Sequence, residues 1–133
     1  MNRIAKRLMK VAMPLTKDTL KNILTPDERA LEYNDIFYFE HIKDFFEQAF
    51  KDDGKQELGY GDLSFDEAAN AYADELSMGN IDLSKDQLLI LPNDNYIVGD
   101  KDKLVDALYE YLTDDPDEKL WNNIVKRMDY LGH

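Results

Sequence analysis

The sequence predicts a mainly α domain of the α+β class, with five or six helices and one β-hairpin near residues 88–98. Along most of the chain, apolar side chains recur three or four residues apart, as in helices that bury one face. The period changes near residue 88, where two short apolar runs flank a turn-forming segment. Apolar residues make up 44% of the 133 residues, which is sufficient for the core of one compact domain.

The chain divides into two units by charge. Residues 1–17 contain five basic residues and no acidic one, whereas the whole chain has a net charge of −12. Ile4, Leu8 and Val11 have helical spacing, and Pro14 is expected to end this helix because the residue before a proline avoids the α region. We therefore expect a basic amphipathic helix at 1–14 and an acidic helical domain with the hairpin at 15–133.

Helix-start signals define the first elements of the acidic domain. Thr16 is the expected N-cap of a short helix, and residues 25–28 (Thr-Pro-Asp-Glu) form the start signal of a second helix. Asn34 and Asp35 are expected to cap a third helix that runs to about Phe50, because the apolar residues of this stretch fit one helical face.

The middle of the chain predicts a loop, a helix and the hairpin. Three glycines indicate a loop over residues 52–63, and Ser64 begins a capping box with a glutamate three residues later. Gly79 is the expected C-terminal stop of that helix. The hairpin is expected to have a four-residue loop at 92–95, and it must pack on helices because two strands alone are marginally stable.

Two further helices complete the expected fold. Asp100 is the predicted N-cap of the first, and residues 115–118 (Asp-Pro-Asp-Glu) open the last. Trp121 is expected to face inward on the last helix.

The charge distribution indicates the kind of partner. Residues 52–118 contain 19 acidic residues and four lysines. Such a surface repels nucleic acid and attracts a basic protein, so we expect no direct nucleic-acid binding. No cysteine is present, and no apolar run approaches the roughly 18–20 residues that span a bilayer. We expect a cytoplasmic protein.

The sequence contains no recognisable catalytic centre, so we expect no enzymatic activity and no cofactor. The histidines are His41 and His133, and His41 is expected to be half-buried on the aromatic third helix. Phosphate-binding loops and nucleophile elbows are absent. A small carboxylate-based enzyme remains an alternative, because acidic residues are abundant.

Residues 61–67 (Gly-Asp-Leu-Ser-Phe-Asp-Glu) resemble the second half of an EF-hand calcium loop, with the glycine and the final glutamate correctly spaced. The first half of the motif differs, because Gln56, Leu58 and Tyr60 occupy positions where EF-hands place oxygen ligands. The resemblance implies Asp62 and Glu67 as ligands of a divergent calcium-binding protein. The alternative interpretation is a helix capping box after a loop, and no metal site is the main expectation.

The strongest functional prediction is an acidic face on the helix after residue 100. Asp102, Asp106 and Glu110 are four residues apart and form one outward stripe, which Asp114 and Asp115 extend. Four helical residues rise about 6 Å, a distance comparable to that between successive phosphates. The expected function is non-catalytic macromolecular binding, as an inhibitor or adaptor that mimics nucleic-acid charge. The alternative interpretation of the acidic residues is a solvated surface that only promotes solubility. Accessory proteins of viruses or mobile elements are the comparable class.

The basic opening helix suggests a second surface, formed by Arg3, Lys6, Arg7 and Lys10. Docking on a protein or on the acidic body of the same chain is the favoured interpretation over membrane binding. A subunit of a larger assembly, anchored by this helix, is therefore an alternative function. The sequence does not predict the oligomeric state.

Overall fold

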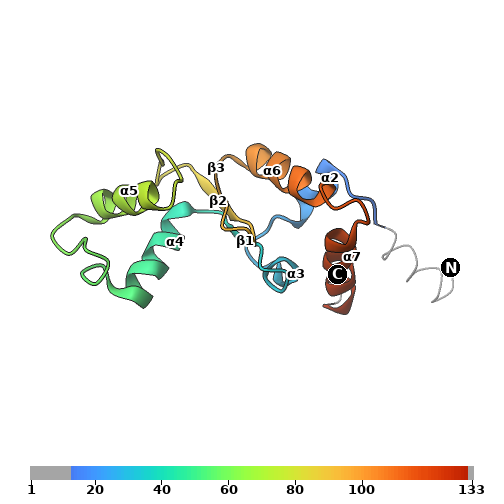
Figure 1. Cartoon of the computed structure of the whole chain (residues 1–133), viewed down its shortest axis with the longest axis horizontal. Helices are drawn as coiled ribbons and strands as arrows, with labels where there is room; N and C mark the ends of the chain where they lie inside the picture. Colours follow the sequence, from blue (N-terminus) through green and yellow to red (C-terminus); the bar gives the residue numbers. More distant parts are fainter. Residues whose placement is uncertain (1–12, 132–133) are drawn as a thin grey trace.

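The computed structural model describes residues 13–131 and confirms the predicted α+β class. In chain order the elements are α2 (Lys17–Ile23), α3 (Arg29–Glu32), β1 (Phe37–Phe39), α4 (Ile42–Ala49), the π-helix η1 (Phe50–Gly54), α5 (Phe65–Glu75), β2 (Gln87–Ile90), β3 (Tyr96–Gly99), α6 (Lys101–Thr113) and α7 (Lys119–Tyr130). The sheet lies between α4 and α5 at one end of an elongated molecule and α2, α3, α6 and α7 at the other (Figure 1).

The predicted hairpin is present as β2 and β3, and β1 adds a third strand. All pairings are antiparallel, in the order β1-β2-β3. Five residues, 91–95, connect the two strands where a four-residue loop was expected, and within them the Leu91 N–H donates to the Asn95 carbonyl over 3.0 Å and closes a turn over residues 92–94. Asp94 completes that turn with a positive φ of 61°, a conformation that aspartate tolerates better than most residues.

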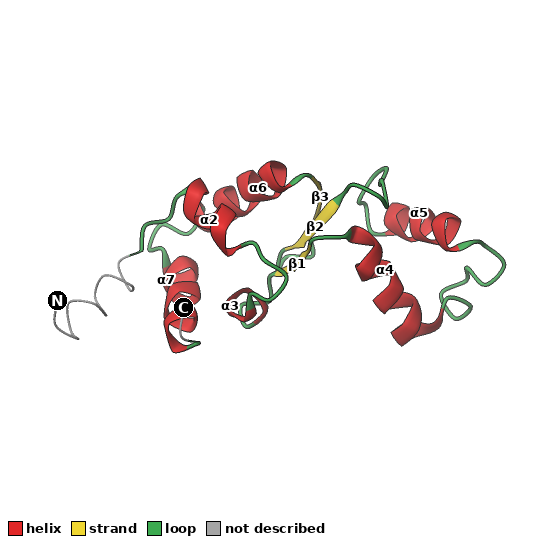
Figure 2. Cartoon of the chain, turned by 180° about the vertical axis from the view of Figure 1, so that it is seen from behind, coloured by secondary structure: helices red, strands yellow, loops and turns green. Residues whose placement is uncertain are grey.

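Strand β2 is buried on both faces, which explains its uninterrupted apolar run. Leu88 faces α4 and α5, whereas Leu89 faces the opposite helices. Figure 2 shows the helices on the two sides of the sheet from behind. The α6 core comprises Leu20, Ile23, Leu24, Ala30, Leu31, Ile36, Leu89, Leu91, Leu104, Val105, Leu108, Leu112, Trp121, Ile124, Val125 and Met128. The α4 core comprises Ile42, Phe46, Ala69, Ala73, Met78, Leu88 and Val98.

The predicted helix from residue 34 to 50 is wrong in about its first half, because α4 begins only at Ile42. Asp35 has a φ of 60°, and the Ile36 N–H donates to the Leu31 carbonyl over 2.9 Å, so Asp35 ends the turn of α3. Residues 37–39 then form β1, because aromatic side chains suit a strand as well as a helix. His41 precedes α4 and is exposed, not half-buried on the helix.

Three predicted N-caps are confirmed. Thr16, Ser64 and Asp100 each accept a hydrogen bond from the backbone N–H three residues later, over 3.1, 3.2 and 2.9 Å. The predicted stop at Gly79 is wrong, because Ser77 adopts the left-handed conformation (φ 59°) that ends α5. The Met78 N–H then donates to the Ala73 carbonyl over 2.9 Å, the bond of a Schellman motif.

Two other boundaries shift. The helix predicted to start at residues 25–28 begins later, since the buried Glu28 carboxylate accepts from the Ala30 N–H over 3.1 Å and caps α3. The loop predicted at 52–63 is partly helical, because η1 continues α4 as a wider turn through Gly54.

Candidate partner-binding surface

The acidic stripe predicted on the sequence lies on α6. Asp102, Asp106 and Glu110 are exposed, while Leu104 and Leu108 on the opposite side of the helix are fully buried. The buried leucines fix the rotation of α6 on the sheet, so the carboxylates must face outward. The predicted acidic stripe is therefore present on the exposed face of α6.

Among the described residues, the lysines of helix α2 form ion pairs with one half of this stripe and not with the other; we call these the paired and the unpaired half. Lys17 Nζ lies 3.1 Å from Asp106 Oδ1, and Lys21 Nζ lies 3.7 Å from Asp102 Oδ1. All four side chains are more than half exposed, so each pair contributes only about 0–1 kcal/mol to stability. The pairs nevertheless neutralise the end of the stripe that begins at residue 102.

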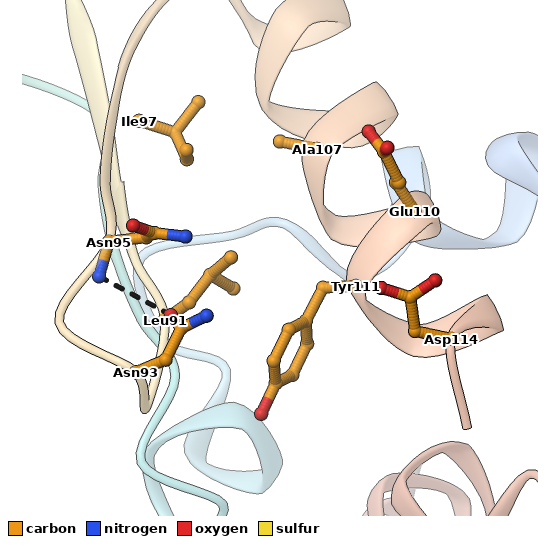
Figure 3. Close-up of a pocket in the computed structure, with 8 residues that line it drawn as sticks. All are labelled: Leu91, Asn93, Asn95, Ile97, Ala107, Glu110, Tyr111 and Asp114. Atoms are coloured by element: carbon orange, nitrogen blue, oxygen red, sulfur yellow. Dashed lines mark hydrogen bonds between the residues drawn. The ribbon is translucent and has the colours of Figure 1, made fainter.

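The unpaired half borders a hollow between α6 and the hairpin (Figure 3). Glu110 and Asp114 are exposed, and no salt bridge among the described residues involves either carboxylate. The hollow has a volume of about 270 Å³ and is lined by Leu91, Asn93, Asn95, Ile97, Ala107, Glu110, Tyr111 and Asp114. The hairpin turn that borders the hollow is stabilised by a hydrogen bond in which the Asn95 N–H donates to Asn93 Oδ1 over 3.3 Å. The hollow thus combines carboxylates with neutral amides.

Asp115 has a structural task at the start of α7. Its Oδ2 accepts from the Leu120 N–H over 3.0 Å and its Oδ1 from the Asp117 N–H over 3.3 Å. The Leu120 bond is the main reason that the pKa of Asp115 lies below its ordinary value. The predicted partner-binding role of Asp115 therefore coexists with a role in opening the last helix, which begins at Lys119.

The predicted basic surface lies outside the described residues. Arg3, Lys6, Arg7 and Lys10 fall within residues 1–12, as does most of the unit predicted at 1–14. Met13 is the first described residue after this segment, and its carbonyl accepts a hydrogen bond from Trp121 Nε1 over 2.9 Å.

The residues of the calcium-loop resemblance form a helix cap. Ser64 Oγ donates to Glu67 Oε1 over 2.9 Å and accepts from the Glu67 N–H, so the glutamate acts at the start of α5. Asp62 is exposed in the preceding turn. Among residues 13–131, neither belongs to a group of three or more side chains placed to hold a metal ion.

A second hollow, on the α4 side of the sheet, was not predicted. It has a volume of about 360 Å³, and its walls are aromatic with two carboxylates at the rim, those of Asp52 and Asp53. Burial, and next the negative charge of Asp53, raises the pKa of Tyr72 in its wall. The spacing of Phe45, Ala49 and Asp52 on one helical face was the available signal, but we assigned residue 52 to a loop.

Comparison of the chain with protein-family models, curated proteins and solved structures finds no match. In the described part of the chain, no helix is both long and apolar enough to cross a membrane.

Proposed function

We propose that this protein acts in the cytoplasm as a non-catalytic binding protein, which recognises a basic surface on another protein. The observation that carries this proposal is the unpaired half of the α6 stripe. Glu110 and Asp114 are exposed at the edge of a hollow, and the described lysines and arginines form no ion pair with them. Uncompensated carboxylates at a concave surface attract a cationic partner.

The division of the stripe sharpens the nucleic-acid mimic hypothesis. Asp102 and Asp106 are already paired within the chain, so the mimic would present Glu110 and Asp114 as its two charges, one helical turn apart. The net charge of −12 adds long-range attraction to a site built for DNA or RNA. An inhibitor or an adaptor that occupies such a site is the specific form of the proposal.

The first test captures partners from host extract at low and at high salt and identifies them by mass spectrometry. A nucleic-acid-binding protein that is retained at low salt and lost at high salt supports the proposal, because exposed charges are screened over about 10 Å at 0.1 M salt. A partner whose binding resists salt contradicts it.

The second test compares two variants with the same change in charge. Replacing Glu110→Gln and Asp114→Asn removes the unpaired carboxylates, whereas Asp102→Asn and Asp106→Asn removes the paired ones. We expect the first pair to weaken partner binding at least tenfold and the second pair to have a smaller effect. Equal affinity of both variants and the unmodified protein would exclude α6 as the interface.

A further inference from the structure

The hollow on the α4 side is built from one face of a continuous helix. The side chains that line it from α4 and η1 are spaced three or four residues apart, so they lie in one row. In chain order this row comprises Phe45, Gln48, Ala49, Asp52 and Asp53. The row is apolar near the sheet and anionic at its outer end.

The sheet supplies the opposite wall. Phe37 pairs with Ile90, and Ile90 pairs with Tyr96, so these three side chains form a cross-strand row on the face that packs toward α4. Phe39 extends the wall along β1, and Tyr72 contributes from α5. Five aromatic rings therefore border one hollow that opens to solvent.

Phe45 holds these rings in place. Its ring centroid lies 5.6 Å from that of Phe39, 6.2 Å from that of Tyr96 and 6.5 Å from that of Tyr72. These separations are typical of packed aromatic pairs, so Phe45 packs against three of the other four rings and this part of the wall is preformed. A preformed wall reduces the entropic cost of binding.

The rim of the hollow carries negative charge without a described counter-ion. Gln48 Nε2 donates to both carboxylate oxygens of Asp52, each over 2.9 Å, which positions that side chain beside the hollow. No lysine or arginine among residues 13–131 lies within ion-pair distance of Asp52 or Asp53. Aromatic ring faces and carboxylates both attract a cation, whereas an uncharged apolar ligand would gain nothing from the two carboxylates. The hollow therefore favours a cationic ligand.

The open edge of the sheet indicates how a cation would be delivered. β1 is an edge strand, and Phe37 on it is 40% exposed. A further hollow of about 410 Å³ borders all three residues of β1 and is also acidic, with Glu32, Glu40 and Asp44 in its lining. An added strand would point every second side chain to the α4 face of the sheet, where the aromatic hollow lies.

We propose that a basic, extended segment of a partner protein lies along the free edge of β1 and inserts a lysine or arginine side chain into the aromatic hollow bordered by Asp52 and Asp53. Main-chain hydrogen bonds to the edge give affinity, and the cation in the hollow gives specificity. This site is separate from the acidic end of α6, so either proposal can fail while the other holds.

The test uses a seven-residue peptide, acetylated and amidated, with a central lysine flanked by valine and threonine. Its control replaces the lysine with norleucine, which keeps the apolar stem and removes the charge. We expect the lysine peptide to shift the backbone amide resonances of residues 37–39 and the ring resonances of Tyr72 and Tyr96 in NMR titrations. The norleucine peptide should bind at least tenfold more weakly.

Matched variants identify the carboxylates responsible. Asp52→Asn with Asp53→Asn should weaken binding of the lysine peptide at least tenfold. Glu57→Gln with Asp62→Asn makes the same change in charge at exposed positions nearby and should leave the affinity within about twofold. Equal binding of the two peptides, equal loss in the two variants, or no binding at millimolar peptide would each overturn the proposal.

Discussion

The two sides of the sheet bury different kinds of core. The α6 core is aliphatic apart from Trp121 and draws on four helices, whereas the α4 core is small and is surrounded by half-buried aromatic rings. Adjacent residues of β2 belong to the two cores: Leu89 packs in the α6 core and Leu88 packs in the α4 core. The sheet therefore joins a closed, well-covered half to a half whose aromatic wall stays partly open to solvent.

This difference in covering affects which side chains each side of the sheet can offer to a partner. Four helices cover most apolar side chains on one side, where Tyr33 and Tyr130 stay exposed and the candidate surface is marked mainly by its carboxylates. Two helices cover the other face incompletely, which leaves both apolar and charged groups at the surface. The α6 stripe and the aromatic hollow follow from this asymmetry.

The largest expected effect on stability comes from truncating one large buried side chain in each core. Trp121 is 1% exposed and Phe46 is 0% exposed, so Trp121→Ala and Phe46→Ala should each lower the free energy of unfolding by about 3–5 kcal/mol. Because β2 belongs to both cores, we expect a single unfolding transition for either variant. Urea unfolding followed by circular dichroism measures both quantities.

A pair of smaller truncations tests the same expectation if the alanine variants do not fold. Ile124→Val and Ile42→Val should each cost about 1 kcal/mol in the α6 core and the α4 core respectively. Hydrogen exchange that accelerates only on the mutated side of the sheet would contradict a shared transition.

The helix caps give the next effect in size. Ser64 caps α5 on one side and Asp100 caps α6 on the other, and each accepts one backbone hydrogen bond. Ser64→Ala and Asp100→Ala should each lower stability by about 1 kcal/mol, measured as a shift in thermal midpoint. Asn122→Ala, at an exposed position of α7, should change stability by less than about 0.5 kcal/mol.

A smaller, stabilising effect is expected where helices end. Ser77 has a φ of 59°, which costs a residue with a side chain about 1–2 kcal/mol. Glycine removes this cost but loses about 0.5–1 kcal/mol through the entropy of the unfolded chain, so Ser77→Gly should gain about 0.5 kcal/mol. Asp35→Gly in the other half should gain less, because aspartate tolerates this conformation. Lower thermal midpoints for both variants would contradict this.

The smallest expected effect is a dependence on pH. Hydrogen bonds hold the pKa of Asp115 below its ordinary value, through the Leu120 N–H first, and that of Asp82 likewise, through the Ser84 hydroxyl first. A lowered folded-state pKa stabilises the fold above the unfolded value of about 4 and loses this contribution as the pH falls through the folded value. Asp115→Asn should therefore flatten the acid limb of the stability curve. Parallel curves for the variant and the unmodified protein would exclude this role.

Local signals predicted much of the fold, because caps and hairpins depend on neighbours in sequence. Thr16, Ser64 and Asp100 act as caps as expected, and the β2–β3 hairpin lies where the apolar period changes. β1 was missed because its partner lies far along the chain: Phe37 pairs with Ile90. A three-residue aromatic strand has no signal of its own that separates it from the helix that follows.

The candidate sites were predictable to different extents. Helical spacing placed Asp102, Asp106 and Glu110 on one face correctly, but the pairing of two of them with Lys17 and Lys21 required knowledge of how α2 packs on α6. The aromatic hollow combines side chains from β1, α4, η1, α5, β2 and β3. Spacing along one element does not show what the sheet and α5 place opposite it.

The position of β2 in the chain has a consequence for synthesis on the ribosome. The strand that contributes to both cores spans Gln87–Ile90, after α2, α3, α4 and α5 have all been made, and the α6 core needs α6 and α7 as well. Until it emerges, the core that contains Leu20 lacks Leu89, the core that contains Phe46 lacks Leu88, and β1 has no partner strand. Neither half of the nascent chain can close before this strand is available, so the apolar faces of α2, α3, α4 and α5 stay incompletely covered until at least about two thirds of the protein has left the ribosome.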